Sequence, residues 1–309
     1  MSNNIFSSST HSSSLTGMAP PATTRVALLI CGSLTGPVRD TNGDYYDVYN
    51  RYWKNTVPPT ANRRLVVDGY NVKEMKYPDE ARISGYDMMM ITGSAADAHD
   101  NAEWITRLIE FVQHLTRDYP KVKLFGVCFG HQIIARAIGG ICARNNAWEV
   151  GPTTVKLTDI GRAVFDVDEL DIQEMHRDHV PLDSISESLS SGEVHLLGST
   201  DLSGCQGLVK FSSSATRPEE EGSLHPKDIQ IITLQGHPEF TEPILTGIVR
   251  QRSASGAVPP DIVADYFGGK GDTGDEAPLD FNDTGKRWKK TNGVDVVGRV
   301  IWRMLGVEC

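Results

Sequence analysis

The segment from Leu124 to Gln132, LFGVCFGHQ, constrains the fold more strongly than any other part of the chain. Gly126 and Gly130 stand two residues to either side of Cys128, and a run with helical character follows. The pattern predicts a strand, a sharp turn and a helix, because a tight turn crowds the positions that flank it. The helix N-terminus would point at the sulfur and favour a reactive thiolate. We therefore expect Cys128 to be a nucleophile exposed at the carboxyl edge of a sheet.

A second motif lies more than one hundred residues further on. The apolar run 231–234 predicts a strand, and it ends in Gln-Gly-His-Pro-Glu at 235–239. This strand would deliver His237 to the same sheet edge as Cys128. Side chains two residues apart in an extended chain point the same way, so Glu239 can bind one ring nitrogen while the other faces the sulfur. A cysteine nucleophile needs such a base, and the base needs an orienting group.

Thr92-Gly93-Ser94 ends another predicted strand in a glycine turn. A turn of this kind can present backbone N–H groups to a developing oxyanion, and we expect Gly93 and Phe129 to be the two donors. An oxyanion site is needed when chemistry passes through a tetrahedral intermediate at a carbonyl. The three motifs together indicate acyl transfer.

Strand-like and helix-like segments alternate through the first half of the chain. The sequence predicts strands at 26–31, 65–67 with 70–75, 86–91 and 122–127, and helices at 44–53 and 102–116. The second half is richer in strands, with candidates at 150–157, 194–199, 208–211 and 229–234 and a polar surface loop at 212–228. We therefore expect an α/β fold with a central, mostly parallel sheet flanked by helices.

We divide the chain into three parts. Residues 1–24 are rich in Ser and Thr, and we expect a disordered tail, with an organellar transit peptide as the weaker alternative. Residues 25–250 would form the domain that carries the motifs. Residues 251–309 would be an extension packed on that domain, with a Gly- and Asp-rich linker at 268–275 and an amphipathic helix at 294–305.

Composition excludes several classes of protein. The 309 residues include 40 acidic against 30 basic side chains, a net charge of −10, with no dense basic cluster, so nucleic acid is not an expected partner. The five cysteines form no Cys-x-x-Cys pair, which favours a reduced, cytoplasmic setting. No apolar run approaches the roughly 18 to 20 residues that cross a bilayer, so we expect no membrane association.

The segments 126–132 and 235–239 resemble the motifs of the class I, or triad-type, glutamine amidotransferase family. The resemblance runs from about residue 25 to 250 and implies a flavodoxin-like, three-layer fold. It also implies that Cys128 is the nucleophile, His237 the general acid and base, and Glu239 the orienting carboxylate. Many members have Gly-Gly where this chain has Gly93-Ser94.

The same resemblance implies how a glutamyl group would be held. Gln132, four residues after the cysteine, matches a residue that holds this group, and the segment 175–179 matches a loop that lines the pocket. The implied substrate-binding residues are Gln132, Ser94, His176, Arg177 and Asp178. By residue type alone, His176, Asp178 and His179 could also be read as a metal cluster, but the spacing favours a pocket-lining loop without metal.

The implied reaction is cleavage of a γ-glutamyl amide bond in a small molecule through a cysteine thioester, without a cofactor. The Met-His-Arg-Asp sequence at 175–178 and the lack of an attached synthetase domain are similar to the branch of γ-glutamyl peptidases and GMP-synthase-like proteins. Two alternatives stay open: a glutaminase subunit that supplies ammonia to a separate synthetase, and a glutamine-responsive regulatory protein without turnover.

Overall fold

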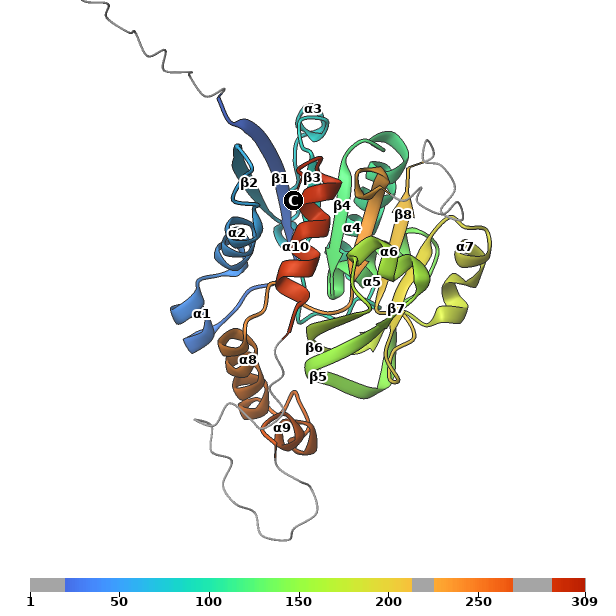
Figure 1. The fold of residues 1–309 in the computed structure, drawn as a ribbon. Helices are drawn as coiled ribbons and strands as arrows, with labels where there is room; N and C mark the ends of the chain where they lie inside the picture. The colour runs from blue at the N-terminus through green and yellow to red at the C-terminus, as the bar shows by residue number, and fades with distance from the viewer. Residues whose placement is uncertain (1–19, 213–224, 269–290, 309) are drawn as a thin grey trace, which may run out of the picture.

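A single mixed sheet forms the centre of the molecule. The computed structural model describes residues 20–212, 225–268 and 291–308. Its strands are β1 (Ala22–Ile30), β2 (Arg63–Asn71), β3 (Met88–Ile91), β4 (Lys123–Val127), β5 (Ala143–Leu157), β6 (Glu169–His179), β7 (His195–Ser199), β8 (Gly207–Phe211) and β9 (Ile229–Leu234). They are ordered β2-β1-β3-β4-β9-β8-β7-β5-β6 across the sheet (Figure 1).

The sheet has a parallel half and an antiparallel half. Strands β2, β1, β3, β4 and β9 pair in parallel, whereas every pairing from β9 to β6 is antiparallel. The predicted α/β architecture is confirmed, and its parallel part is the half that carries the motifs. Because parallel strands end at one edge, β3, β4 and β9 bring residues 93, 128 and 237 to the same side of the sheet.

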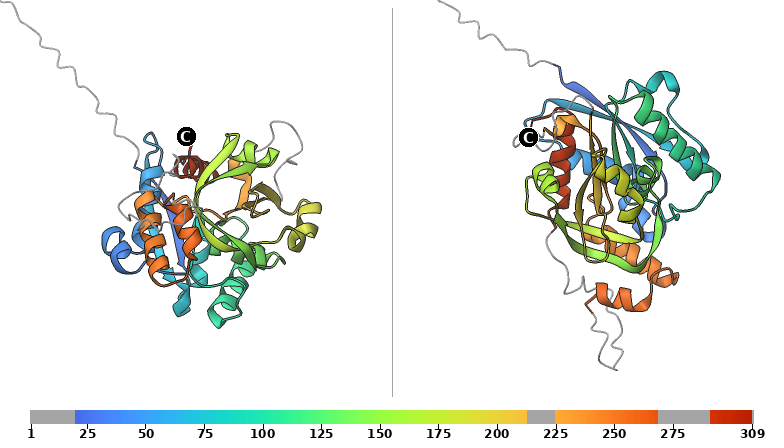
Figure 2. Two further views of the ribbon diagram at one scale, coloured as in Figure 1. Left: turned by 90° about the horizontal axis from the view of Figure 1, so that it is seen from below. Right: turned by 90° about the vertical axis from the view of Figure 1, so that its right-hand side faces the viewer.

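Helices cover both faces of this sheet. They are α1 (Gly36–Asn42), α2 (Tyr45–Thr56), α3 (Glu80–Ile83), α4 (Glu103–Asp118), α5 (Phe129–Ala137), α6 (Asp159–Phe165), α7 (Ser186–Ser190), α8 (Glu242–Ala254), α9 (Pro260–Tyr266) and α10 (Gly293–Met304). Along β1, Val26 and Leu28 pack with α2 and α10, whereas Ala27 and Leu29 pack with α4 and α5. The left view of Figure 2, which looks along the strands, shows α10 (red) and α4 (blue-green) on opposite sides of the sheet.

Several sequence predictions differ from the structure. Strand β1 begins at Ala22 rather than at 26, because its first residues pair with β2 from Arg63 onward. The predicted strand at 70–75 ends at Asn71 and continues as a 3-10 turn, Val72–Glu74. Strand β6 was not predicted. Residues 1–19 of the predicted tail, and most of the predicted 212–228 loop and 268–275 linker, lie outside the described residues.

The last helix packs on the first half of the chain. The Trp53 and Trp302 rings of α2 and α10 meet edge to face with centroids 5.7 Å apart, and Trp302 Nε1 donates to Thr56 Oγ1 at 3.2 Å. Gly298 of α10 faces Thr56 so closely that a Cβ there would stand 2.5 Å from the threonine Cβ. None of the helices in the described ranges combines the length and apolar character needed to cross a membrane.

Candidate active site

Cys128 occupies a strained turn between β4 and α5. Its φ of 51° and ψ of −105° lie in a region that residues other than glycine rarely adopt. The Cys128 N–H donates to Leu234 O at 2.8 Å, which fastens the turn to the end of β9. The backbone thus has the strand, sharp turn and helix that the sequence predicts.

The two flanking glycines are required by close approach of α5 to the sheet. A Cβ on Gly130 would lie 2.3 Å from Ile91 O in β3, and a Cβ on Gly126 would lie 2.7 Å from Gly130 O. Real Cβ atoms essentially never come this close to backbone oxygen. Larger residues at either position would force α5 away from the sheet and move Cys128.

His237 is fixed from three sides at the end of β9. Its Nδ1 lies 2.8 Å from Glu239 Oε1, its backbone N–H donates to Gln173 O at 2.7 Å, and its ring stacks on Phe240 with centroids 4.0 Å apart. Both His237 and Glu239 are buried. The predicted contact between these two side chains is present, and the second ring nitrogen is left for the Cys128 side.

The charge state of His237 follows from its neighbours. Burial disfavours the charged ring, but the Glu239 carboxylate and a hydrogen bond with the Cys128 side chain outweigh burial and raise the pKa of His237 to about 10. The imidazolium is therefore the stable form at neutral pH. A protonated imidazole at this position can act as a general acid.

Tyr49 of α2 is a neighbour of this group that the sequence did not indicate. Its hydroxyl donates to Glu239 Oε1 at 2.8 Å. Burial and the Glu239 charge together raise the pKa of Tyr49 well above its usual value, so it remains a donor. The sequence shows Tyr49 only as one member of an apolar helix face.

We expect Tyr49→Phe to position the Glu239 carboxylate less firmly, because the variant lacks the hydroxyl that donates to it. Losing one buried hydrogen bond to a carboxylate should cost about 1 to 3 kcal/mol of unfolding free energy and lower kcat/KM about fivefold. Chemical denaturation and steady-state kinetics measure both. Tyr52→Phe is the matched control, because Tyr52 lies in the same helix and its buried hydroxyl has no hydrogen-bond partner among the described residues. Equal effects of the two variants would contradict a specific role for Tyr49.

A small hollow of about 70 Å³ opens beside Cys128. It is lined by Ser94, Ala95, Ala96, Asp97, Cys128, Gln132, Arg144, Trp148, Met175, His176, Arg177, Asp178 and Arg252. All five residues predicted to bind substrate are in this lining. Arg252, from the last turn of α8, belongs to the part of the chain that was predicted to be an extension.

The predicted pocket loop at 175–179 is instead the end of strand β6. Oxygen atoms surround the His176 ring: Nδ1 lies 2.9 Å from Asp178 O, and Nε2 lies at ion-pair distances of 3.0 Å from Glu149 Oε2 and 3.3 Å from Glu174 Oε2. Burial opposes the charged ring, but these carboxylates raise the pKa of His176 well above its usual value. His176 is thus tied into a buried ion cluster.

Gln132 and Arg177, which also line the hollow, have internal partners as well. Gln132 Nε2 donates to Asp178 O at 2.8 Å and to Gln235 Oε1 at 3.0 Å. Arg177 Nε donates to Asn145 O at 3.0 Å. The Gln132–Asp178 bond holds the end of β6 against the helix that follows Cys128, and the Arg177 bond ties β6 to β5. Gln132 thus positions the pocket wall whether or not it also touches a substrate.

One group of side chains has the donor types of a metal site. Ligand atoms of His99, Cys142 and Asp178 lie within 4.8 Å of one another, the single such group in the described ranges. The Asp178 carboxylate is already engaged, with Arg144 Nε 2.6 Å from Oδ1 and His99 Nδ1 3.0 Å from Oδ2. The arginine supplies the positive charge that a metal would bring, so this arrangement favours an ion-pair network.

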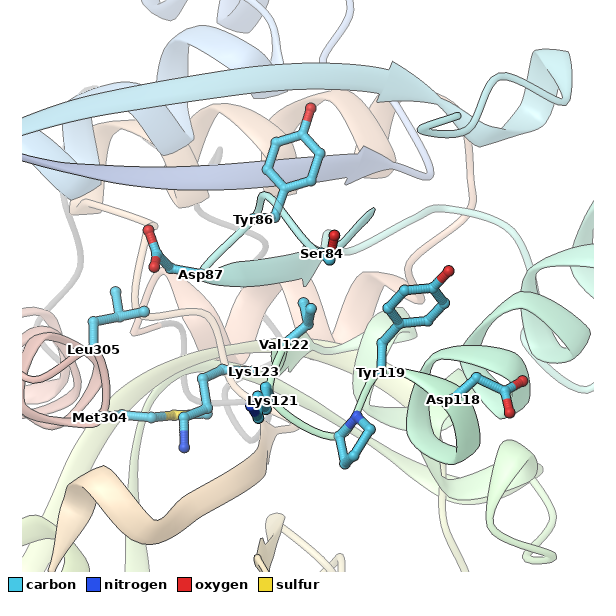
Figure 3. Close-up of a pocket in the computed structure, with 11 residues that line it drawn as sticks. Ser84, Tyr86, Asp87, Asp118, Tyr119, Lys121, Val122, Lys123, Met304 and Leu305 are labelled. Atoms are coloured by element: carbon cyan, nitrogen blue, oxygen red, sulfur yellow. The ribbon is translucent and has the colours of Figure 1, made fainter. Parts of the chain in front are cut away.

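A larger hollow of about 570 Å³ lies at the opposite, amino-terminal end of the parallel strands (Figure 3). Its wall includes Tyr86, Tyr119, Lys123 and Leu305. Lys123 Nζ donates to the carbonyls of residues 227 and 229, so its charge is turned to the backbone. We place the candidate site at the smaller hollow, because that one contains the strained cysteine and adjoins the buried histidine.

Comparison with known proteins shows the family to which the chain belongs. The family model described as Glutamine amidotransferase class-I matches residues 46–243, close to two thirds of the chain. This chain belongs to the class I glutamine amidotransferase family. The resemblance inferred from the two motifs is thereby confirmed.

Two relatives with different names are similar to this chain in sequence. A glutamine amidotransferase-like protein of Schizosaccharomyces pombe is 30% identical over 229 residues, 73% of this chain and 83% of the relative. Gamma-glutamyl peptidase 3 of Arabidopsis thaliana is 29% identical over 73% of this chain and 80% of its own length. A glutamine amidotransferase structure from Thermotoga maritima has a TM-score of 0.57 at 13% identity, covering 92% of this chain and 99% of the other, which shows the shared fold.

Proposed function

We propose that this amidotransferase-family chain hydrolyses a γ-glutamyl amide bond through a thioester on Cys128. The observation that carries the proposal is the strained cysteine beside a buried His237 that Glu239 holds by its Nδ1. Relatives named gamma-glutamyl peptidase and glutamine amidotransferase-like support the reaction class.

In the first half of the proposed reaction, Cys128 Sγ attacks the γ-carbonyl carbon. The S–C bond forms, and the carbonyl oxygen becomes an oxyanion. His237 then gives its proton to the departing nitrogen as the C–N bond breaks, which releases the amine and leaves a γ-glutamyl thioester. In the second half, water attacks the thioester, His237 takes a proton from that water, and glutamate leaves as the thiolate is restored.

The oxyanion donors are proposed to be the N–H groups of Ser94 and Phe129. Neither N–H has a hydrogen-bond partner within residues 20–212, 225–268 and 291–308. Phe129 directly follows the nucleophile, and Ser94 lines the hollow. The Gly93 N–H, which the sequence predicts for this role, belongs to the same turn and stays a proposed donor beside that of Ser94.

The test is release of glutamate and free amine from purified protein. Glutamine and a γ-glutamyl dipeptide are each supplied without any synthetase, and both products are measured by chromatography. The proposal expects equal amounts of glutamate and amine from at least one of the two. Glutamate release from neither substrate would contradict the proposal and favour a glutaminase subunit that requires its synthetase, or a protein without turnover.

The alkaline limit of activity should follow His237. The pKa of His237 is about 10 in the folded protein and about 6.5 in the unfolded chain. The charged ring therefore adds its full contribution to the free energy of unfolding below about pH 6.5, and this contribution is lost as pH rises through about 10. We expect kcat/KM to fall above about pH 10, when the ring of the free enzyme can no longer protonate the amine. Glu239→Gln removes the charge that raises this pKa, so its alkaline limb should move to lower pH. Identical limbs for both proteins would contradict the assignment of Glu239.

A further inference from the structure

The proposed oxyanion donors belong to two different elements of the fold. The Phe129 N–H opens helix α5, whereas the N–H groups of Gly93 and Ser94 belong to the loop 92–102 between β3 and α4. Donors stabilise an oxyanion only when all of them stand at hydrogen-bond distance from one point, so the loop and the helix must keep a fixed spacing. A side chain that joins the two elements can therefore affect catalysis without touching the substrate.

Arg136 joins the loop and the helix in this way. It lies in the last turn of α5, about two helical turns after Phe129. Its Nη1 donates to Ala98 O at 2.5 Å and to Asp100 O at 2.8 Å. Its Nη2 donates to Asn101 Oδ1 at 2.9 Å. The rigid fork of a guanidinium can hold all three acceptors at once, so one side chain of α5 fastens the second half of the loop.

The first half of the loop is fastened to the sheet instead. Ser94 Oγ donates to the carbonyl of Cys31, directly after β1, at 2.8 Å, and the Ala96 N–H donates to Ser94 Oγ at 3.1 Å. These bonds tie the turn that carries the proposed donors to the end of β1. The spacing between this turn and α5 then depends on how the rest of the loop is held.

Two ion pairs hold the loop to the strands on its other flank. Asp97 Oδ2 lies 2.8 Å from Arg144 Nη2, and His99 Nδ1 lies 3.0 Å from Asp178 Oδ2. The Asp97 and Arg144 side chains are 46% and 44% exposed, and ion pairs as exposed as this one stabilise little. The second pair carries opposite charges only when the histidine is protonated. The three bonds from the half-buried Arg136 are therefore the firmer attachment.

The loop and the segment that follows it also pack on the first turn of α5. The Ala98 side chain is fully buried, in the same core cluster as Phe129 and Ile133. The Trp104 ring, at the start of α4, stacks on the Phe129 ring with centroids 5.4 Å apart. A shift of the loop would therefore be transmitted to the residue that supplies the second oxyanion donor.

We propose that Arg136 is a positioning residue for the oxyanion site, which sets the spacing between the loop 92–102 and the start of α5. This rests on the proposed thioester hydrolysis and its oxyanion donors. Arg136 is outside the lining of the Cys128 hollow, so it acts through the backbone rather than on the substrate. Its loss should lower kcat more than it changes KM, because displaced donors weaken a contact that is made in the transition state.

The test compares hydrolysis with alkylation of Cys128 by iodoacetamide, followed by mass spectrometry of the Cys128 peptide. Attack on a saturated carbon forms no oxyanion, so alkylation reports on the thiol and its base alone. Arg136→Gln should lower kcat for glutamate release about 10- to 100-fold, with KM within about threefold and alkylation within about twofold of wild type. Arg136→Lys should retain part of kcat, because it keeps a charged donor without the planar fork.

Two further variants support this comparison. Asn101→Ala removes only the Nη2 bond and keeps the arginine, so it should lower kcat about two- to fivefold and remains informative if Arg136→Gln does not fold. Arg107→Gln is the control, since Arg107 is an exposed arginine on neighbouring α4. It should match wild type in both assays.

The outcomes separate this inference from the proposed function. If wild type releases glutamate and kcat is unchanged in Asn101→Ala and in the folded Arg136 variants, the hydrolase stands and the role of Arg136 is overturned. Alkylation that falls as much as hydrolysis would also overturn it, because the arginine would then serve the nucleophile. The same holds for a rise in KM at constant kcat. If wild type releases no glutamate, the hydrolase proposal fails and the inference falls with it.

Discussion

Cys128→Ala is expected to reduce glutamate release about a thousandfold or more, because no other group can form the acyl intermediate. The residual rate would come from substrate binding and the oxyanion donors alone. The assay is steady-state hydrolysis of whichever γ-glutamyl substrate wild type prefers. Removing one sulfur atom at a position that is 6% exposed should leave the fold intact, which thermal unfolding can verify.

Cys205→Ala is the matched control for the loss at Cys128. Cys205 is also buried, and its sulfur lies 3.9 Å from His131 Nε2, away from the Cys128 hollow. Burial raises the pKa of Cys205 to about 12, so it is a neutral thiol at physiological pH. Its variant should retain wild-type activity within about twofold. Equal losses in both variants, or none at Cys128, would contradict the assignment of the nucleophile.

Gly93→Ala is expected to lower kcat about 100-fold, although the change adds only one methyl group. The new Cβ would stand 2.9 Å from His237 Cε1, 3.7 Å from His237 Nδ1 and 3.8 Å from Cys128 Cβ. The ring cannot turn aside easily, because Phe240 stacks on its face and Glu239 holds Nδ1. The methyl group must therefore displace the imidazole from the sulfur.

Gly85→Ala controls for substitution of glycine next to the same strand. Gly85 precedes β3 whereas Gly93 follows it, and a Cβ on Gly85 would meet only Arg82 O, at 3.2 Å. Steady-state kinetics should show near wild-type activity for Gly85→Ala and a defect in kcat for Gly93→Ala. Full activity in Gly93→Ala would mean that His237 does not need its observed position.

The sequence was informative where apolar runs end in glycine. Strands β3 and β9 are buried along their whole length, so uninterrupted runs such as Ile231–Leu234 could be recognised without knowledge of their partners. The Cys128 turn was equally visible, because Gly126 and Gly130 are required by the approach of α5 to the sheet. These local signals were enough to predict the fold class and which strand ends meet.

Strand β6 could not be predicted in the same way. It buries Gln173, Glu174 and His176, polar residues that a hydrophobic pattern assigns to a loop. Their burial is compensated in part by partners from distant segments, such as Glu149 of β5 for His176. A pattern along one segment contains no information about such partners.

Tyr49 and Arg252 were missed for a related reason. The spacing of Tyr49 in α2 indicates a buried helix face, but not that its hydroxyl meets Glu239, 190 residues away. Arg252 follows the last motif and carries no pattern of its own. Both became visible only once the helices were placed around the end of the sheet.

The most direct test of this account is mass spectrometry of the protein during turnover. Wild type is mixed with a γ-glutamyl substrate, quenched in acid and digested. A transient γ-glutamyl adduct is expected on the peptide that contains Cys128, and it should disappear as substrate is exhausted. An adduct on another residue, or glutamate release with no adduct and no loss in Cys128→Ala, would contradict the thioester mechanism.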